Sequence, residues 1–88
     1  MRLIEWSFHP KFEIMTKIRD NDFLIAFGTH VRKIRIANKM SQYEMSYASD
    51  IPKSQIVRIE KGEINTGISS VAAMAKALDV TPADLFNF

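Results

Sequence analysis

Residues 41–62, SQYEMSYASDIPKSQIVRIEKG, contain the start, turn and end signals that decide the fold. Ser41 and Glu44 have the spacing of a capping box, in which a hydroxyl and a carboxylate satisfy free amides where a helix begins. This helix is expected to end before Pro52, because proline disfavours a helical conformation in the residue before it and suits the first turn of a new helix. Gly62 is expected to end the second helix. Two short helices joined by a tight turn predict a helix-turn-helix.

The segment before this motif predicts an amphipathic helix. Its cap is expected at Asn21 or Asp22, and the helix is expected to continue to about residue 38. Apolar side chains recur every three or four positions along one side, at Phe23, Phe27, Val31 and Ile34. We expect this stripe to face the core.

Two further helices are expected after the motif. An alanine-rich run over residues 68–78 has apolar residues at helical spacing. Thr81, Pro82 and Asp84 then supply a hydroxyl cap, a first-turn proline and an acidic residue, which predicts a short last helix. The expected fold class is therefore all-α, with five helices in one helix-turn-helix domain over residues 21–88.

Residues 1–20 do not continue this pattern and are interpreted as an N-terminal extension. Ile4, Trp6 and Phe8 alternate with polar residues until Pro10 interrupts the alternation. An ordered arm and a mobile tail are both compatible with this composition. A third interpretation is that Met15 is the natural start.

The composition excludes several functional classes. The chain has no cysteine, which rules out disulfides and thiolate metal sites and fits the cytoplasm, where we expect the protein to associate with the nucleoid. No apolar stretch approaches the roughly 20 residues that a membrane span requires. His9 and His30 are the only histidines, and no carboxylate cluster has metal-ligand spacing. We therefore expect no enzymatic activity, metal, cofactor or small-molecule ligand.

The charge distribution indicates a polyanionic partner more clearly than the net charge of +2. Seven basic and three acidic residues give residues 32–61 a net charge of +4, whereas residues 62–88 carry −2. A basic middle would orient the domain on a nucleic acid. An ordinary solvated surface is the other interpretation of the same charges.

Several separated residues resemble the phage-repressor (Cro/repressor, XRE) family of helix-turn-helix proteins. The resemblance covers about residues 23–86 and rests on Phe27-Gly28, Val31, Arg35, Gln42, Ile56, Ile59-Glu60, Gly62 and Ala75-Lys76-Ala77-Leu78. It implies a sequence-specific regulator of transcription that binds double-stranded DNA. Within this class, a chromosomal or phage-type regulator and a restriction–modification controller protein are both open, and the short chain resembles the latter.

The resemblance implies that a recognition helix of about residues 53–61 enters the major groove. The implied base-reading residues are Lys53, Ser54, Gln55, Val57 and Arg58. An arginine such as Arg58 can donate two hydrogen bonds to guanine, which contributes about 1–3 kcal/mol of discrimination. Val57 offers an apolar contact for a thymine methyl group.

A second set of residues is expected to contact DNA phosphates. Gln42 resembles the family's glutamine at the start of the second helix, and Asn65 and Thr66 match the loop after the recognition helix. The basic residues Lys39 and Lys61 are expected to join them. Such contacts fix the register on the duplex and carry little sequence information.

The resemblance also implies a structural ion pair between Arg35 and Glu60, which would fix the recognition helix to the first helix. Three positions depart from the family pattern. Asp50 replaces the turn glycine, Pro52 replaces a small helix cap, and Ser46 replaces an alanine. Aspartate tolerates a left-handed backbone better than most residues, so we expect the turn to survive.

A homodimer on a palindromic operator is expected, because one recognition helix buries little surface. Leu85, Phe86 and Phe88 are the expected dimer contacts, although Leu85 and Phe86 could instead complete the core. The alternative function is a protein-interaction module, similar to an antitoxin, that uses the same fold. Exposure of Trp6, Phe8 and Phe12 would favour that alternative.

Overall fold

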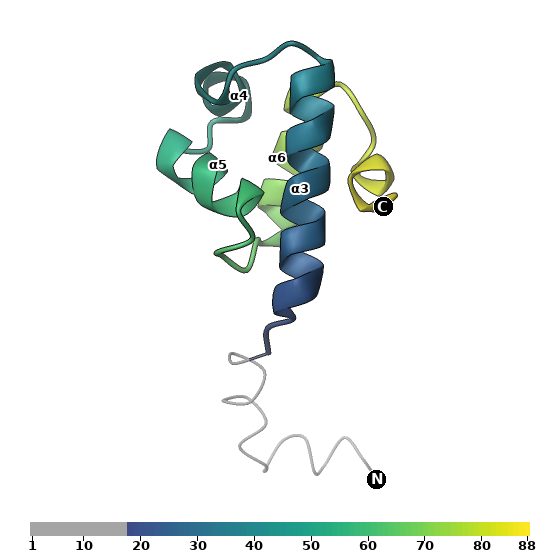
Figure 1. The fold of residues 1–88 in the computed structure, drawn as a ribbon. Coiled ribbons are helices and arrows are strands. Elements are labelled where there is room, and N and C mark those ends of the chain that lie inside the picture. Colours follow the sequence, from purple (N-terminus) through teal and green to yellow (C-terminus); the bar gives the residue numbers. More distant parts are fainter. Residues whose placement is uncertain (1–17) are drawn as a thin grey trace, which may run out of the picture.

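The computed structural model describes residues 18–88, and all regular structure in that range is helical. The elements are α3 (Asn21–Ala37), α4 (Gln42–Ser49), α5 (Lys53–Glu60), α6 (Ile68–Ala77) and a 3₁₀ helix, η1 (Pro82–Phe86). Helices α4 and α5 lie on one side of α3, and η1 lies on the other (Figure 1). The all-helical fold was predicted correctly. Most of the predicted N-terminal extension, residues 1–17, lies outside the described residues.

The last element is a 3₁₀ helix, so the prediction of a fifth α-helix is not confirmed. Its start is the expected one: the Thr81 hydroxyl accepts from the Asp84 amide at 3.2 Å, and the Asp84 carboxylate accepts from the Thr81 amide at 2.9 Å. Only five residues follow this cap before the element ends. Such short pieces commonly adopt the tighter 3₁₀ geometry.

The cap of α3 lies one residue earlier than predicted. Asp20, rather than Asn21 or Asp22, accepts a hydrogen bond from the Phe23 amide at 3.0 Å. Phe23 is 48% exposed, and Leu24, which is 9% exposed, takes the inward position in the first turn. Phe23 therefore does not belong to the buried stripe predicted for this helix.

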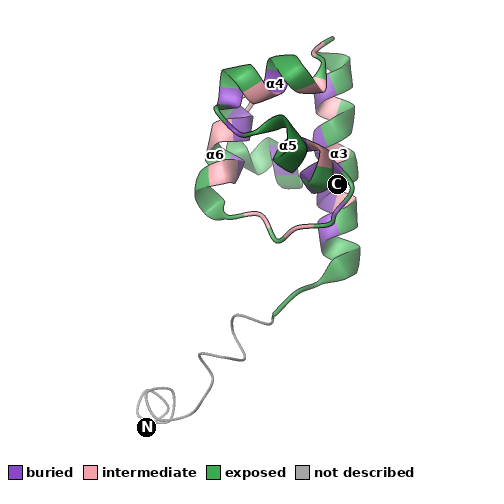
Figure 2. Ribbon diagram, turned by 90° about the vertical axis from the view of Figure 1, so that its left-hand side faces the viewer, coloured by how far each residue is buried: buried purple, intermediate pink, exposed green. Residues whose placement is uncertain are grey.

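One core joins the helices and η1. It is composed of Phe27, Val31, Met45, Ile51, Ile56, Ile59, Val71, Met74, Ala75, Leu78 and Leu85. Each helix contributes the apolar residues of one side, and the opposite sides are exposed (Figure 2). Burial of these side chains supplies the main stabilising term of so small a domain.

Helix α5 is held against α3 by a close backbone approach at Gly28. A Cβ atom at this position would collide with the carbonyl oxygen of Ile59 and lie 2.8 Å from that of Glu60. Gly62 then ends the turn after α5 with a φ of +73°, which glycine adopts without strain. Both glycines therefore fix how the C-terminal end of α5 sits on the body of the domain.

Candidate nucleic-acid interface

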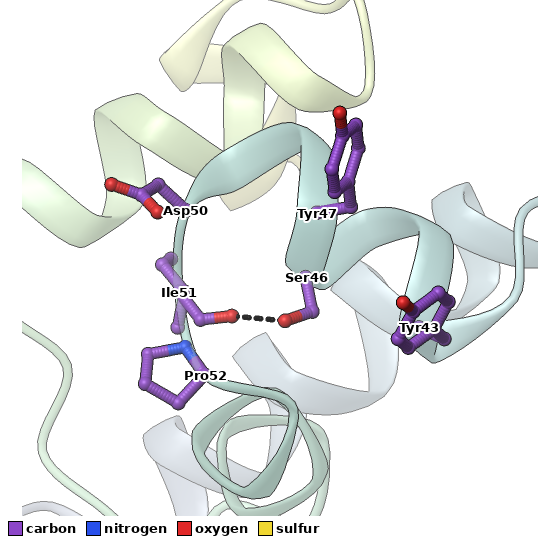
Figure 3. A pocket seen from close by; sticks show the side chains of 6 residues that line it. All are labelled: Tyr43, Ser46, Tyr47, Asp50, Ile51 and Pro52. Carbon is purple, nitrogen blue, oxygen red and sulfur yellow. Dashed lines mark hydrogen bonds between the residues drawn. The ribbon is translucent and has the colours of Figure 1, made fainter.

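The turn between α4 and α5 is held by hydrogen bonds despite its departures from the family pattern. Asp50 adopts the left-handed conformation, with a φ of +62°, and its amide donates to the Ser46 carbonyl at 2.9 Å. The Ser46 hydroxyl donates to the Ile51 carbonyl at 2.5 Å (Figure 3). Pro52 supplies no side-chain cap for α5. The serine that replaces the family alanine thus ties α4 to the residue before α5.

Helix α5 buries one side and presents the other to solvent. Ile56 and Ile59 are 0% and 2% exposed and anchor the helix in the core. The opposite side is exposed and faces the viewer in Figure 2. Of the five implied base-reading residues, four are exposed and Val57 is partly buried; the four are Lys53, Ser54, Gln55 and Arg58.

Arg58 is free to change partners. Its Nε atom lies 3.6 Å from a carboxylate oxygen of Glu63, and the two side chains are 56% and 51% exposed. An ion pair this exposed contributes at most about 1 kcal/mol. A stronger acceptor in front of α5 could therefore replace Glu63 at little cost.

Arg35 and Glu60 form the ion pair that the resemblance implied. The arginine donates from Nε at 2.6 Å and from Nη2 at 3.0 Å to the two carboxylate oxygens. Its Nη1 atom also donates to the Met40 carbonyl at 2.8 Å. The pair is buried and joins the C-terminal part of α3 to the last residue of α5.

Gln42 lies differently from what the family pattern implied. Its side-chain amide points to the same carboxylate and donates to Glu60 at 3.0 Å. The glutamine is therefore engaged inside the protein and would have to turn outward to reach a phosphate.

The loop after α5 also differs from its predicted role. The Asn65 side chain donates to the Ile18 carbonyl at 3.2 Å, so its amide ties the loop to the start of α3. The Thr66 hydroxyl is buried, with no hydrogen-bond partner within residues 18–88. Thr66 as a whole is only partly buried, so the predicted contact of this loop with a phosphate stays a prediction. Lys39 and Lys61 are both exposed, as a phosphate contact requires.

The C-terminal residues predicted as a dimer contact separate into two groups. Leu85 is completely buried in the core, so it is unavailable to a second subunit. Phe86 and Phe88 are 42% and 52% exposed. The ring of Phe23 lies 6.3 Å from that of Phe86 and 5.5 Å from that of Phe88. These three phenylalanines form a surface, termed here the aromatic patch.

His30 lies at the edge of the aromatic patch. Its Nε2 atom is 2.8 Å from the Asp84 carbonyl oxygen, and its ring is 5.7 Å from that of Phe88. His30 thus has a structural role in joining α3 to η1.

The backbone amide and hydroxyl of Thr81 lower the pKa of the Asp84 carboxyl below its ordinary value.

A hollow between α3 and α5 places two residues of α3 beside predicted DNA contacts of α4 and α5. It is lined by Thr29, Arg32, Gln42, Val57, Glu60 and Lys61. Arg32 was not among the predicted DNA contacts, because nothing in the sequence places it beside Lys61. The spacing of Thr29 and Arg32 by three residues is the only sequence feature that joins them on one side of a helix.

Two other types of site are not found among the described residues. Within residues 18–88, no three acidic or histidine side chains lie together as a metal ion would require. No helix in that range is long and apolar enough to cross a membrane. The polar side of α5 and the basic residues around it are therefore the main candidate site.

Comparisons with known proteins agree with this geometry. A family model described as helix-turn-helix matches residues 31–85. The control protein C.BamHI of Bacillus amyloliquefaciens is 35% identical over 69 residues, which span 77% of this chain and 85% of that protein. The HTH-type transcriptional regulator y4dL of Sinorhizobium fredii, whose function is uncharacterized, is 42% identical over 50 residues, 57% of this chain and 26% of that protein.

Among solved structures, the restriction-modification controller protein C.AhdI from Aeromonas hydrophila superimposes with a TM-score of 0.71. It is 32% identical and covers 72% of this chain and 96% of its own. The residues that match the family model include α4, the turn and α5, which form the candidate interface. The chain therefore belongs to the XRE-type helix-turn-helix family of DNA-binding transcription regulators.

Proposed function

We propose that this protein binds a specific double-stranded DNA sequence by placing α5 in the major groove. The observation that carries the proposal is the exposed polar side of α5, on a helix whose other side is anchored by Ile56 and Ile59. A fixed helix with free donors on its outer side is what direct readout of base edges requires.

Arg58 is the principal base-reading residue in this proposal. It can exchange its long contact with Glu63 for two hydrogen bonds to the O6 and N7 atoms of a guanine. Lys53, Ser54 and Gln55 are exposed beside it and supply further hydrogen bonds. Val57, partly buried on the side toward α3, offers a methyl contact.

Phosphate contacts hold the domain on the duplex. Lys39 and Lys61 supply exposed charges for them. Gln42 and Asn65 join only if they exchange their present partners, Glu60 and the Ile18 carbonyl. Because such an exchange costs hydrogen bonds, the lysines provide most of this affinity.

The protein acts as a homodimer on a two-fold symmetric operator. The aromatic patch supports this step, since three large rings remain half-exposed beside a complete core. Self-association through one such patch creates a two-fold axis, which a palindromic site would match. Sedimentation should show a dimer of the 10.1 kDa chain that dissociates in the Phe88→Ser variant.

The names of two similar proteins suggest the biological role. C.BamHI is a control protein, and C.AhdI is a restriction-modification controller protein. We infer that this chain likewise regulates expression in a restriction–modification system.

Selection of bound sequences from random duplex DNA tests the proposal. We expect a two-fold symmetric site whose guanine preference relaxes in Arg58→Ala, with a loss of about 1–3 kcal/mol in binding. Lys76→Ala is the matched control, because Lys76 is an exposed cation on α6, away from the interface. Failure of the wild-type protein to enrich any sequence would refute the proposal and favour the protein-interaction alternative.

A further inference from the structure

The hollow between α3 and α5 has the composition of an anion site. Its volume is about 440 Å³, and it opens beside the N-terminal residue of α4. Helix α3 contributes Thr29 and Arg32, whose side chains carry a hydroxyl and a guanidinium. Helix α5 contributes the ammonium of Lys61 from its C-cap.

The positive charge of this hollow is not neutralised from within. Glu60 is the only acidic residue that lines it, and both of its carboxylate oxygens already accept hydrogen bonds from Arg35. In the described part of the chain, neither Arg32 nor Lys61 has a side-chain hydrogen bond or an ion pair. Two cations therefore share one hollow without an internal partner.

We propose that Arg32, with Lys61 and Thr29, binds one backbone phosphate of the DNA. This inference rests on the proposed function, and it adds a contact from α3 to those of α4 and α5. A guanidinium matches the tetrahedral oxygens of a phosphate with two parallel hydrogen bonds, and a hydroxyl can donate a third. Such a ligand needs no base, so the contact positions the domain without reading sequence.

The position of the hollow connects it to the recognition helix. Val57 and Lys61 are one helical turn apart on the side of α5 that faces α3. Val57 is one of the proposed base contacts. A phosphate held one turn of α5 away from it would belong to the DNA strand at the edge of the major groove. Arg32 would therefore fix how far α5 enters the groove.

Lys33 provides a matched control on the same helix. It is exposed, like Arg32, but it does not line the hollow. His30, one turn before Lys33, contacts η1, which places this side of α3 away from α5. Arg32→Gln and Lys33→Gln each remove one positive charge from the same helix, and of the two residues only Arg32 lines the hollow.

The experiment measures the affinity of full-length wild type, Arg32→Gln and Lys33→Gln for the selected duplex over a range of salt concentrations. We expect Arg32→Gln to bind roughly fivefold to tenfold more weakly at 0.1 M salt and to lower the salt slope by about one, as one lost phosphate contact requires. Lys33→Gln should bind like wild type, and Arg32→Lys should keep the slope because it keeps the charge. Thermal melting should be unchanged, since Arg32 is exposed.

A scan with neutral methylphosphonate linkages identifies the ligand. One linkage should weaken wild type as much as Arg32→Gln does, and it should have no further effect on that variant. If wild type binds no duplex, the proposed function itself fails. If wild type binds and Arg32→Gln equals Lys33→Gln, or if no linkage shows this non-additivity, the phosphate site is refuted while DNA binding stands.

Discussion

Removal of the Glu60 carboxylate should destabilise the protein more than removal of the whole ion pair. Glu60 accepts from Arg35 at 2.6 and 3.0 Å and from Gln42 at 3.0 Å. The side chains of Arg35 and Glu60 are 9% and 3% exposed. Glu60→Ala therefore leaves a guanidinium buried without its counter-charge.

The magnitude follows from that burial. An uncompensated buried charge costs about 3–5 kcal/mol, whereas apolar residues in place of both partners are often neutral or stabilising. Arg35→Met with Glu60→Leu also leaves the Met40 carbonyl without its donor, which costs about 1–3 kcal/mol. A domain of roughly 70 residues has on the order of 4–10 kcal/mol of stability, so Glu60→Ala should remove much of it.

Urea unfolding followed by circular dichroism at 25 °C measures this difference. We expect the double variant to retain at least about 2 kcal/mol more stability than Glu60→Ala. Glu60→Gln, which keeps an acceptor of the same shape, serves as a second variant if Glu60→Ala does not fold. Glu63→Ala is the surface control and should change stability by less than about 0.5 kcal/mol. A double variant as unstable as Glu60→Ala would contradict the reasoning.

Three further perturbations test the packing and the C-terminal cap. Gly28→Ala should lower the free energy of unfolding by at least about 2 kcal/mol because its Cβ meets the backbone of α5. Gly67→Ala has nothing within 4 Å and should cost less, about 0.5–1 kcal/mol, because it only replaces the N-cap glycine of α6. Leu85→Ala should cost about 2–5 kcal/mol in denaturant unfolding, and a smaller loss would mean that this side chain is not core. The pKa of Asp84 is lowered from its ordinary 3.8 by the Thr81 amide and hydroxyl, so its contribution to stability is present above that pH and disappears as the pH falls through the folded-state pKa. Asp84→Asn should remove this acid dependence, and an NMR titration that finds the Asp84 pKa at or above its ordinary value would contradict it.

Local signals in the sequence predicted the helix-turn-helix well. Helix α4 begins directly after the expected cap at Ser41 and ends before Pro52, and α5 begins directly after Pro52. The left-handed conformation at Asp50 was also predicted. These features depend on hydrogen bonds and steric limits within a few residues, so the sequence contains the information they need.

The sequence did not indicate where several side chains point in the folded protein. Gln42 turns to Glu60, 18 residues away in the sequence, and Thr66 turns inward. Leu85 fills the core, whereas Phe86 next to it stays partly exposed. Each outcome is decided by a residue from another element, and helical periodicity alone does not identify that residue.

The structure separates two ways in which a substitution can weaken DNA binding. Glu60 receives hydrogen bonds from Arg35 of α3 and Gln42 of α4, so it fixes α5 from behind without facing the groove. A variant that loosens this anchor must pay extra ordering entropy on binding and should lose both stability and affinity. Arg32→Gln removes only an exposed charge, so it should lose affinity at unchanged stability. Plotting affinity against unfolding free energy for both variants therefore distinguishes residues that hold the recognition helix from residues that hold the DNA.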